Sequence, residues 1–160
     1  METLYKQIND FIWKHPFIKG CIHFISRFCP YMIIIFYSLF LLKIYIEWQS
    51  QLFYFIRHPL YSVLVVLIIK LLINRQRPMQ KYNIKPIDDT KKTNYSFPSI
   101  QVAFAVSVAL TVIKYGPNMG LLLSTLAIAI TITRFLSGIH YLSDVVISVF
   151  IAYIINFLFK

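Results

Sequence analysis

Three short clusters of polar residues interrupt an otherwise apolar chain, and each carries groups suited to binding phosphate. They are Lys70 with Arg77–Pro78, the run Pro98-Ser99-Ile100-Gln101, and Arg134 with His140 and Asp144. An arginine guanidinium can hold two phosphate oxygens through parallel hydrogen bonds, and a lysine adds a compact charge. A helix that begins near Ser99 would present free backbone N–H groups and its positive dipole end to an anion. Together the clusters predict a phosphate site.

A nucleophile for that phosphate is indicated by His140 and Asp144, which lie four residues apart. On a helix that begins near His140, both side chains would share one face. Asp144 would then hold one ring nitrogen and direct the other toward phosphorus, as the carboxylate of a catalytic triad does. Taken singly, a lysine at a membrane edge usually snorkels and a lone histidine is usually a satisfied polar residue. The joint spacing favours the chemical interpretation.

The elements that must position these clusters are membrane helices. The chain of 160 residues is 58% hydrophobic and only 14% charged, and its mean hydropathy is +0.66. Soluble domains carry about a quarter charged residues, and a membrane span needs roughly 20 apolar residues. We expect an all-α integral membrane helical bundle, a single domain over residues 1–160, with five or six transmembrane helices. The five main candidates are Tyr31–Glu47, Pro59–Ile73, Ser99–Tyr115, Gly120–Phe135 and Asp144–Phe159.

Two segments lie outside these spans. Residues 1–29 mix apolar and basic residues at helical spacing, which predicts an amphipathic helix in the membrane interface, with a sixth span as the alternative. Pro16 is expected to start or kink a helix there. Residues 74–97 form a polar loop of a length that is usually functional. Alternation of the spans places this loop and residues 137–143 on one side, so the three clusters should meet there.

The formal net charge of +10 narrows the classes of partner. A nucleic-acid-binding protein would gather its lysines and arginines on a soluble basic face, whereas here they stand between apolar segments. We therefore expect a phosphorylated membrane lipid and the lipid bilayer as partners, and no nucleic acid. Cys21 and Cys29 match no metal-binding spacing and are expected to be inert packing residues.

The spacing of the clusters resembles that of the type 2 phosphatidic acid phosphatase family of lipid phosphate phosphatases, whose motifs are K-x6-RP, PSGH and SR-x5-H-x3-D. The chain carries the first motif intact and the third with Thr133 in place of serine, and its GIHYLSDV is similar to the family's GVHYPSDV. The resemblance implies phosphoryl transfer through a phosphohistidine, with His140 as nucleophile and Asp144 as its orienting residue. It implies no metal and no cofactor. The phosphate oxygens would be bound by Lys70, Arg77, Ser99, the backbone N–H of Ile100, and Arg134.

The second motif departs from the family pattern. Gln101 stands where the family has a histidine that protonates the leaving group, and Ile100 replaces the glycine, so its side chain can crowd the phosphate. A glutamine amide cannot give up a proton near neutral pH, and general acid catalysis contributes roughly 10²–10⁴-fold. Two substitutes are open: a diphosphate substrate, whose leaving group is itself a phosphate, or a tyrosine, Tyr95 or Tyr141, acting through water. The other histidines are expected to be poor substitutes; they are His15, His23 and His58.

The function expected from these residues is hydrolysis of a membrane lipid phosphate or diphosphate, with undecaprenyl diphosphate as the first candidate. The alternative is a pseudophosphatase that binds phosphorylated lipid, or assists a membrane partner, without turnover. The basic residues of the loop over 74–97 would place the site in the cytoplasm by the positive-inside rule. Resemblance to bacterial family members favours the bacterial plasma membrane with the site facing outside, which is the orientation we expect.

Overall fold

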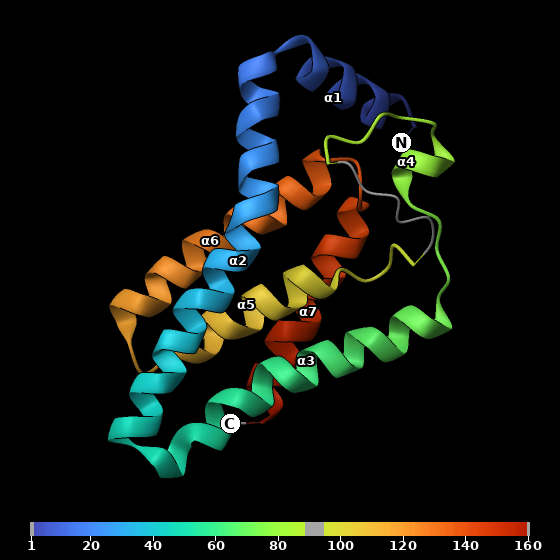
Figure 1. The fold of residues 1–160 in the computed structure, drawn as a ribbon. Coiled ribbons are helices and arrows are strands. Elements are labelled where there is room, and N and C mark those ends of the chain that lie inside the picture. The colour runs from blue at the N-terminus through green and yellow to red at the C-terminus, as the bar shows by residue number, and fades with distance from the viewer. Residues whose placement is uncertain (1, 89–94, 160) are drawn as a thin grey trace.

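The chain is helical throughout most of the residues that the computed structural model describes, which are 2–88 and 95–159 (Figure 1). A short 3-10 turn, η1 (Gln49–Gln51), links the second and third α-helices. These two ranges contain no strand, so the prediction of an all-α fold is confirmed. The α-helices are α1 (Glu2–Lys14), α2 (Pro16–Glu47), α3 (Leu52–Leu72), α4 (Pro78–Lys81), α5 (Ile100–Val112), α6 (Pro117–Leu136) and α7 (Leu142–Leu158).

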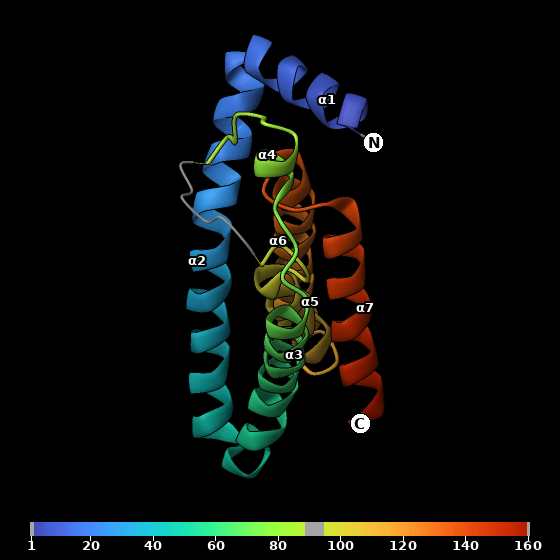
Figure 2. The same ribbon diagram turned by 90° about the vertical axis from the view of Figure 1, so that its right-hand side faces the viewer.

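Helix α5 is the centre of the bundle, because it contacts α2, α3, α6 and α7. Its small and β-branched residues let these neighbours approach closely, and Val102, Ala103 and Val108 have no exposed surface. Figure 2 shows α2 and α7 on opposite sides of the helices between them. Helix α1 crosses one end of the bundle near α4, and the C-terminus lies at the other end (Figure 1).

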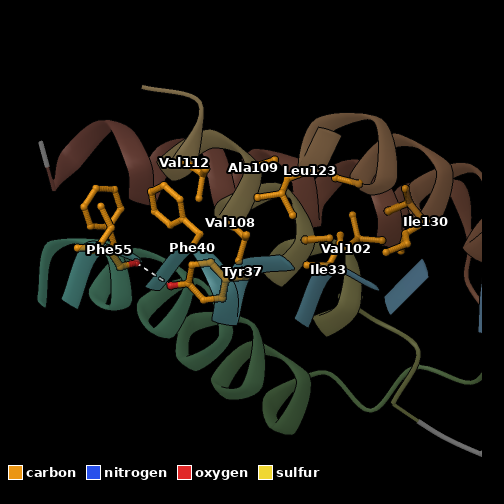
Figure 3. Close-up of a cluster of buried hydrophobic side chains, with 14 residues drawn as sticks. Ile33, Tyr37, Phe40, Phe55, Val102, Val108, Ala109, Val112, Leu123 and Ile130 are labelled. Atoms are coloured by element: carbon orange, nitrogen blue, oxygen red, sulfur yellow. Dashed lines mark hydrogen bonds between the residues drawn. The ribbon is translucent and has the colours of Figure 1, made fainter. Parts of the chain in front are cut away.

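The main apolar core ties α2 and α3 to this central helix (Figure 3). Phe55 of α3 is fully buried and meets Phe40 of α2 edge to face, with ring centroids 5.1 Å apart. The Tyr37 hydroxyl donates to the Phe55 carbonyl at 2.9 Å, so a polar group inside the core has its partner.

The outer surface of the bundle is apolar: Ile46, Leu71, Phe150 and Tyr153 are each more than half exposed. Within the described residues, three helical segments are long and apolar enough to cross a membrane, namely α2, Gln49–Leu72 and α6. Helices α5 and α7 are apolar but shorter. The chain is an integral membrane protein, while the number of five or six spans stays a prediction.

The N-terminal segment differs from the single amphipathic helix predicted over 1–29. Helix α1 ends at Lys14, and a new helix begins at Pro16, which occupies its first turn. Residues 16–29 therefore belong to the same helix as the first predicted span. At 1.5 Å per residue this 32-residue helix is about 48 Å long, which exceeds the ~30 Å hydrocarbon layer. Pro30 does not end it, as prolines are tolerated in membrane helices.

Gly120 makes the close contact between the start of α6 and the end of α5 possible. A Cβ atom at Gly120 would lie 2.2 Å from the Ile113 Cα, a backbone atom that cannot move aside. We expect Gly120→Ala to destabilise the bundle by about 1–3 kcal/mol, the usual cost of overpacking, seen as a lower unfolding temperature in detergent. Gly20→Ala is the matched control, because a Cβ there meets nothing within 4 Å. Equal unfolding temperatures for the two variants would contradict this contact.

Candidate active site

The three polar clusters meet at the end of the bundle where α3 and α6 end and α5 and α7 begin, beside α4 (Figure 1). His140 lies in the turn between α6 and α7. Gly138 makes this turn possible with φ of +73°, a left-handed conformation that glycine adopts without strain. The His140 N–H donates to the Arg134 carbonyl at 3.3 Å, which holds the histidine against the end of α6.

The His140 ring is buried between a cation and a carboxylate. Its Nε2 lies 3.5 Å from Nη1 of Arg77, and its Nδ1 lies 3.5 Å from Oδ2 of Asp144. Both distances are at the outer limit of a hydrogen bond, so neither contact is a strong one. The arrangement leaves Nε2 on the side of the guanidinium, where a phosphate would bind.

Asp144 is a fixed carboxylate, fully buried in the first turn of α7. Its Oδ1 accepts a hydrogen bond from Arg75 at 2.8 Å, and its Oδ2 accepts one from the Tyr141 N–H at 3.0 Å and another from the Ser96 hydroxyl. Three donors hold both oxygens, so the orientation of Asp144 is set before any ligand arrives. The sequence patterns predicted no site role for Arg75 or Ser96.

Burial, more than any other factor, lowers the pKa of His140 to about 4, and the charges of Arg77 and Lys70 add to this, while Asp144 opposes it. The imidazole is therefore neutral at physiological pH, as a nucleophile must be. Since the unfolded chain takes up this proton near pH 6.5, the fold also loses stability as the pH falls from about 6.5 toward 4.

We expect the imidazole NMR signal that His140→Ala removes to titrate near pH 4 in the ligand-free protein. The unperturbed pKa of a histidine side chain is about 6.5. A midpoint near 6.5 for His140 would contradict the buried, neutral ring.

Arg77, the residue before α4, and Lys70 of α3 lie at the same end of the bundle. The buried Arg77 donates to the Ile139 carbonyl at 3.2 Å, and burial lowers the pKa of its guanidinium. Its Nε has no partner among the described residues. Lys70, in the last turn of α3, donates to the Pro98 carbonyl at 3.1 Å. Arg77 thus keeps a donor for an anion.

Ser99 caps the start of α5 at this end. Its N–H donates to the Ser148 hydroxyl at 2.7 Å, and Ser148 in turn donates to the Asp144 carbonyl at 2.6 Å. The buried Ser99 Oγ has no partner in the described part of the chain. Ile100 is the first residue of α5, so its N–H has no acceptor within the helix. Both groups are suited to phosphate oxygens.

The Arg134 side chain is held by partners on the side of α2, which the sequence did not predict. It donates to the Ser26 carbonyl of α2 at 2.7 Å, and its Nη1 lies 3.7 Å from Oδ2 of Asp88. No contact to His140 is among its described side-chain interactions. Its Nε lacks a partner within residues 2–88 and 95–159.

Two cavities adjoin the start of α5, and Gln101 lines both. We call the polar one, of about 420 Å³, the α2 pocket; its polar lining residues are His23, Ser26, Arg27, Asp88, Gln101 and Arg134. The other is an apolar groove of about 580 Å³ between α2, α3 and α5, lined by Ile33, Tyr37, Leu60, Val63, Ile100 and Phe104 among others. The Ile100 side chain thus contributes to the apolar groove.

The two tyrosines considered as proton donors differ in setting. Tyr141 is buried in an aromatic cluster with Tyr5, and burial raises its pKa to about 12, which makes it a weak acid. Tyr95 is partly exposed, and its carbonyl accepts a hydrogen bond from Arg77. His58 lies at the opposite end of the bundle, within 2.6 Å of the Phe159 carbonyl, and is out of reach of the site.

Among the described residues, no group of three histidine, cysteine, aspartate or glutamate side chains is arranged to hold a metal ion. The groups gathered at the site are cationic donors and one buried carboxylate, a set that suits an anionic ligand.

A family model described as the PAP2 superfamily matches residues 51–160 of the chain. The chain belongs to the PAP2 superfamily. Membership confirms the resemblance noted in the sequence and the prediction of a hydrolase of the phosphatase type. A comparison with curated protein sequences gave no match.

Two solved structures share the fold of this PAP2 protein. LpxE from Aquifex aeolicus superposes with a TM-score of 0.76 at 19% identity, covering 98% of this chain and 92% of that one. A PAP2-type phosphatidylglycerolphosphate phosphatase from Bacillus subtilis gives a TM-score of 0.72 at 17% identity, covering 99% and 83%. At these identities the likeness concerns the fold, which extends over nearly the whole chain.

Proposed function

We propose that this PAP2 protein hydrolyses the phosphate or diphosphate of a membrane lipid with His140 as the nucleophile. The observation that carries the proposal is the buried His140 ring, with Arg77 3.5 Å from Nε2 and Asp144 3.5 Å from Nδ1. A cation beside Nε2 can hold a phosphate oxygen there. The carboxylate keeps the proton on Nδ1 and the lone pair on Nε2.

In the proposed reaction, the lone pair of His140 Nε2 forms a bond to phosphorus while the bond from phosphorus to the leaving oxygen breaks. The electron pair of that bond goes to the leaving oxygen. Water then attacks the phosphohistidine, the P–N bond breaks, and Nε2 regains its lone pair as phosphate departs. The charge on the phosphoryl oxygens is met by fixed donors, which lowers the barrier. These donors are Lys70, Arg77, Arg134, the Ser99 hydroxyl and the Ile100 N–H.

The apolar groove supports a lipid as the substrate. It runs between α2 and α3 and reaches Ile100 and Gln101, next to the start of α5. A lipid chain in the groove would bury apolar surface and bring the phosphate to Ser99. The apolar outer surface of the same helices lets such a lipid enter from the bilayer.

Among lipid phosphates we propose a diphosphate first, and undecaprenyl diphosphate in particular. Its leaving group is a phosphate, which needs less help from a proton donor than a lipid alkoxide, and Gln101 cannot supply a proton. A phosphatidylglycerolphosphate-type monophosphate comes next, supported by the Bacillus subtilis protein of the same fold. We place the protein in a bacterial plasma membrane with the site facing outside.

Gln101 also favours one alternative, a pseudophosphatase that binds phosphorylated lipid without turning it over. Both functions require the cations of the site, so both predict that Arg77→Ala weakens binding of a lipid phosphate. Only the phosphatase releases inorganic phosphate.

The deciding experiment measures phosphate release by the purified protein in detergent from undecaprenyl diphosphate, phosphatidylglycerolphosphate and phosphatidic acid. We expect the highest kcat/KM on the diphosphate. Binding of all three lipids without release, by protein shown to be folded, would favour the pseudophosphatase. If none of the three lipids binds and none releases phosphate, both functions would be overturned.

A further inference from the structure

The α2 pocket contains a histidine paired with a carboxylate at the place where this chain lacks its proton donor. His23, on α2, lies with Nδ1 3.3 Å from Oδ1 of Asp88. The other Asp88 oxygen accepts a hydrogen bond from the Ser26 hydroxyl and lies 3.7 Å from Arg134. Asp88 is thus held between α2 and α6, with its Oδ1 beside the His23 ring and without a hydrogen-bond partner among the described residues.

The α2 pocket contains one of the proposed phosphate donors, Arg134, and shares lining residues with the apolar groove. Gln101 and Arg134 line it, and Arg134 has an unpartnered Nε for a phosphate oxygen, within the described residues. Pro30, Ile34 and Gln101 line both this pocket and the apolar groove, so the two cavities meet at these residues. The leaving oxygen joins the phosphate to the lipid chain and would therefore lie where the cavities meet.

Resting on the proposed function, we infer that His23, oriented by Asp88, protonates the leaving oxygen in place of the histidine that Gln101 replaces. Histidine is the side chain whose ordinary protonation range lies nearest to neutral pH, so it can give and take a proton there. His23 lies 78 positions before Gln101 in the sequence, but in the fold both residues line the α2 pocket.

His23 gives up one proton when the phosphohistidine forms and regains one when it is hydrolysed. In the first step, the P–O bond breaks, its electron pair stays on the leaving oxygen, and protonated His23 gives that oxygen its proton, so a lipid monophosphate leaves as the alcohol and a lipid diphosphate leaves as the lipid monophosphate. In the second, water attacks phosphorus and neutral His23 accepts the proton that water loses. The P–N bond breaks, His140 regains its lone pair, and His23 is protonated for the next turnover.

The test compares leaving groups that need a proton with one that does not. In His23→Gln we expect kcat/KM for a lipid monophosphate to fall by about 10²-fold or more, the usual share of a general acid. For p-nitrophenyl phosphate, whose phenolate leaves unprotonated, we expect a change of less than about threefold on the same grounds. A purely structural role for His23 would lower both values together.

Two further variants sharpen the result. His15→Gln is the matched control, because His15 is exposed and lies outside the α2 pocket, and it should change neither value. Adding Gln101→His to His23→Gln should restore hydrolysis of the monophosphate. An equal loss on both substrates, or no loss on the monophosphate, would overturn the role of His23 and leave the proposed function standing. Failure of the unmodified protein to release phosphate from any substrate would instead overturn the proposed function itself.

Discussion

His140→Ala is expected to reduce phosphate release from a lipid phosphate by at least about 10⁴-fold, because no other group can take the place of the attacking nitrogen. The imidazole is buried, neutral and bracketed by Arg77 and Asp144, and alanine leaves the rest of the site in place. The measurement is initial-rate phosphate release in detergent, together with brief labelling by a radioactive lipid phosphate and acid-free isolation of the protein. The unmodified protein should carry base-stable, acid-labile phosphate, and the variant none.

The control for this prediction is His15→Ala, which removes an exposed imidazole from the N-terminal end of α2. It should keep full activity and full labelling. Substantial turnover by folded His140→Ala, or label that persists in it, would show that His140 is not the nucleophile.

Asp144→Asn is expected to lower kcat/KM by about 10³- to 10⁴-fold, the size of effect seen when the orienting carboxylate of a catalytic triad becomes an amide. An amide presents one donor and one acceptor where Asp144 presents two acceptors to three donors, Arg75, Ser96 and the Tyr141 N–H. The His140 ring would lose the charge that favours a proton on Nδ1. Arg75 would also lose the partner of its charge.

Asp10→Asn provides the same chemical change at an exposed position of α1 and should leave activity unaltered. Because Asp144 also closes the first turn of α7, the unfolding temperature of the variant must be measured beside its rate. Activity within about tenfold of the unmodified protein would place the orienting role elsewhere, since triad carboxylates contribute far more than that.

Local sequence patterns predicted the type of fold but not the length of every helix. The apolar composition and the periodic segments were sufficient to predict a helical membrane bundle, and Pro16 marks a helix start as expected. The length of α2 was not predicted, because in the sequence Pro30 and the basic residues before it resemble the end of a helix. In the bundle, α2 packs against α6, a contact between segments far apart in the sequence that no local pattern shows.

The sequence by itself determined the groups of the candidate site whose relation is local. His140 lies two residues before α7 and Asp144 lies in its first turn, and Ser99 and Ile100 stand at the start of α5, so the members of each pair are close because they are close in sequence. These roles stay predictions until the variants are measured.

Only the tertiary structure decided which distant residues complete the site. Arg75 and Ser96 hold Asp144 from 69 and 48 positions away, and Arg134 pairs with Asp88 and α2. His23, set aside in the sequence as a poor substitute, lines the same pocket as Gln101. Contacts of this kind depend on how residues 73–88 run from α3 across the end of the bundle toward α2, and no local pattern encodes that path (Figure 2).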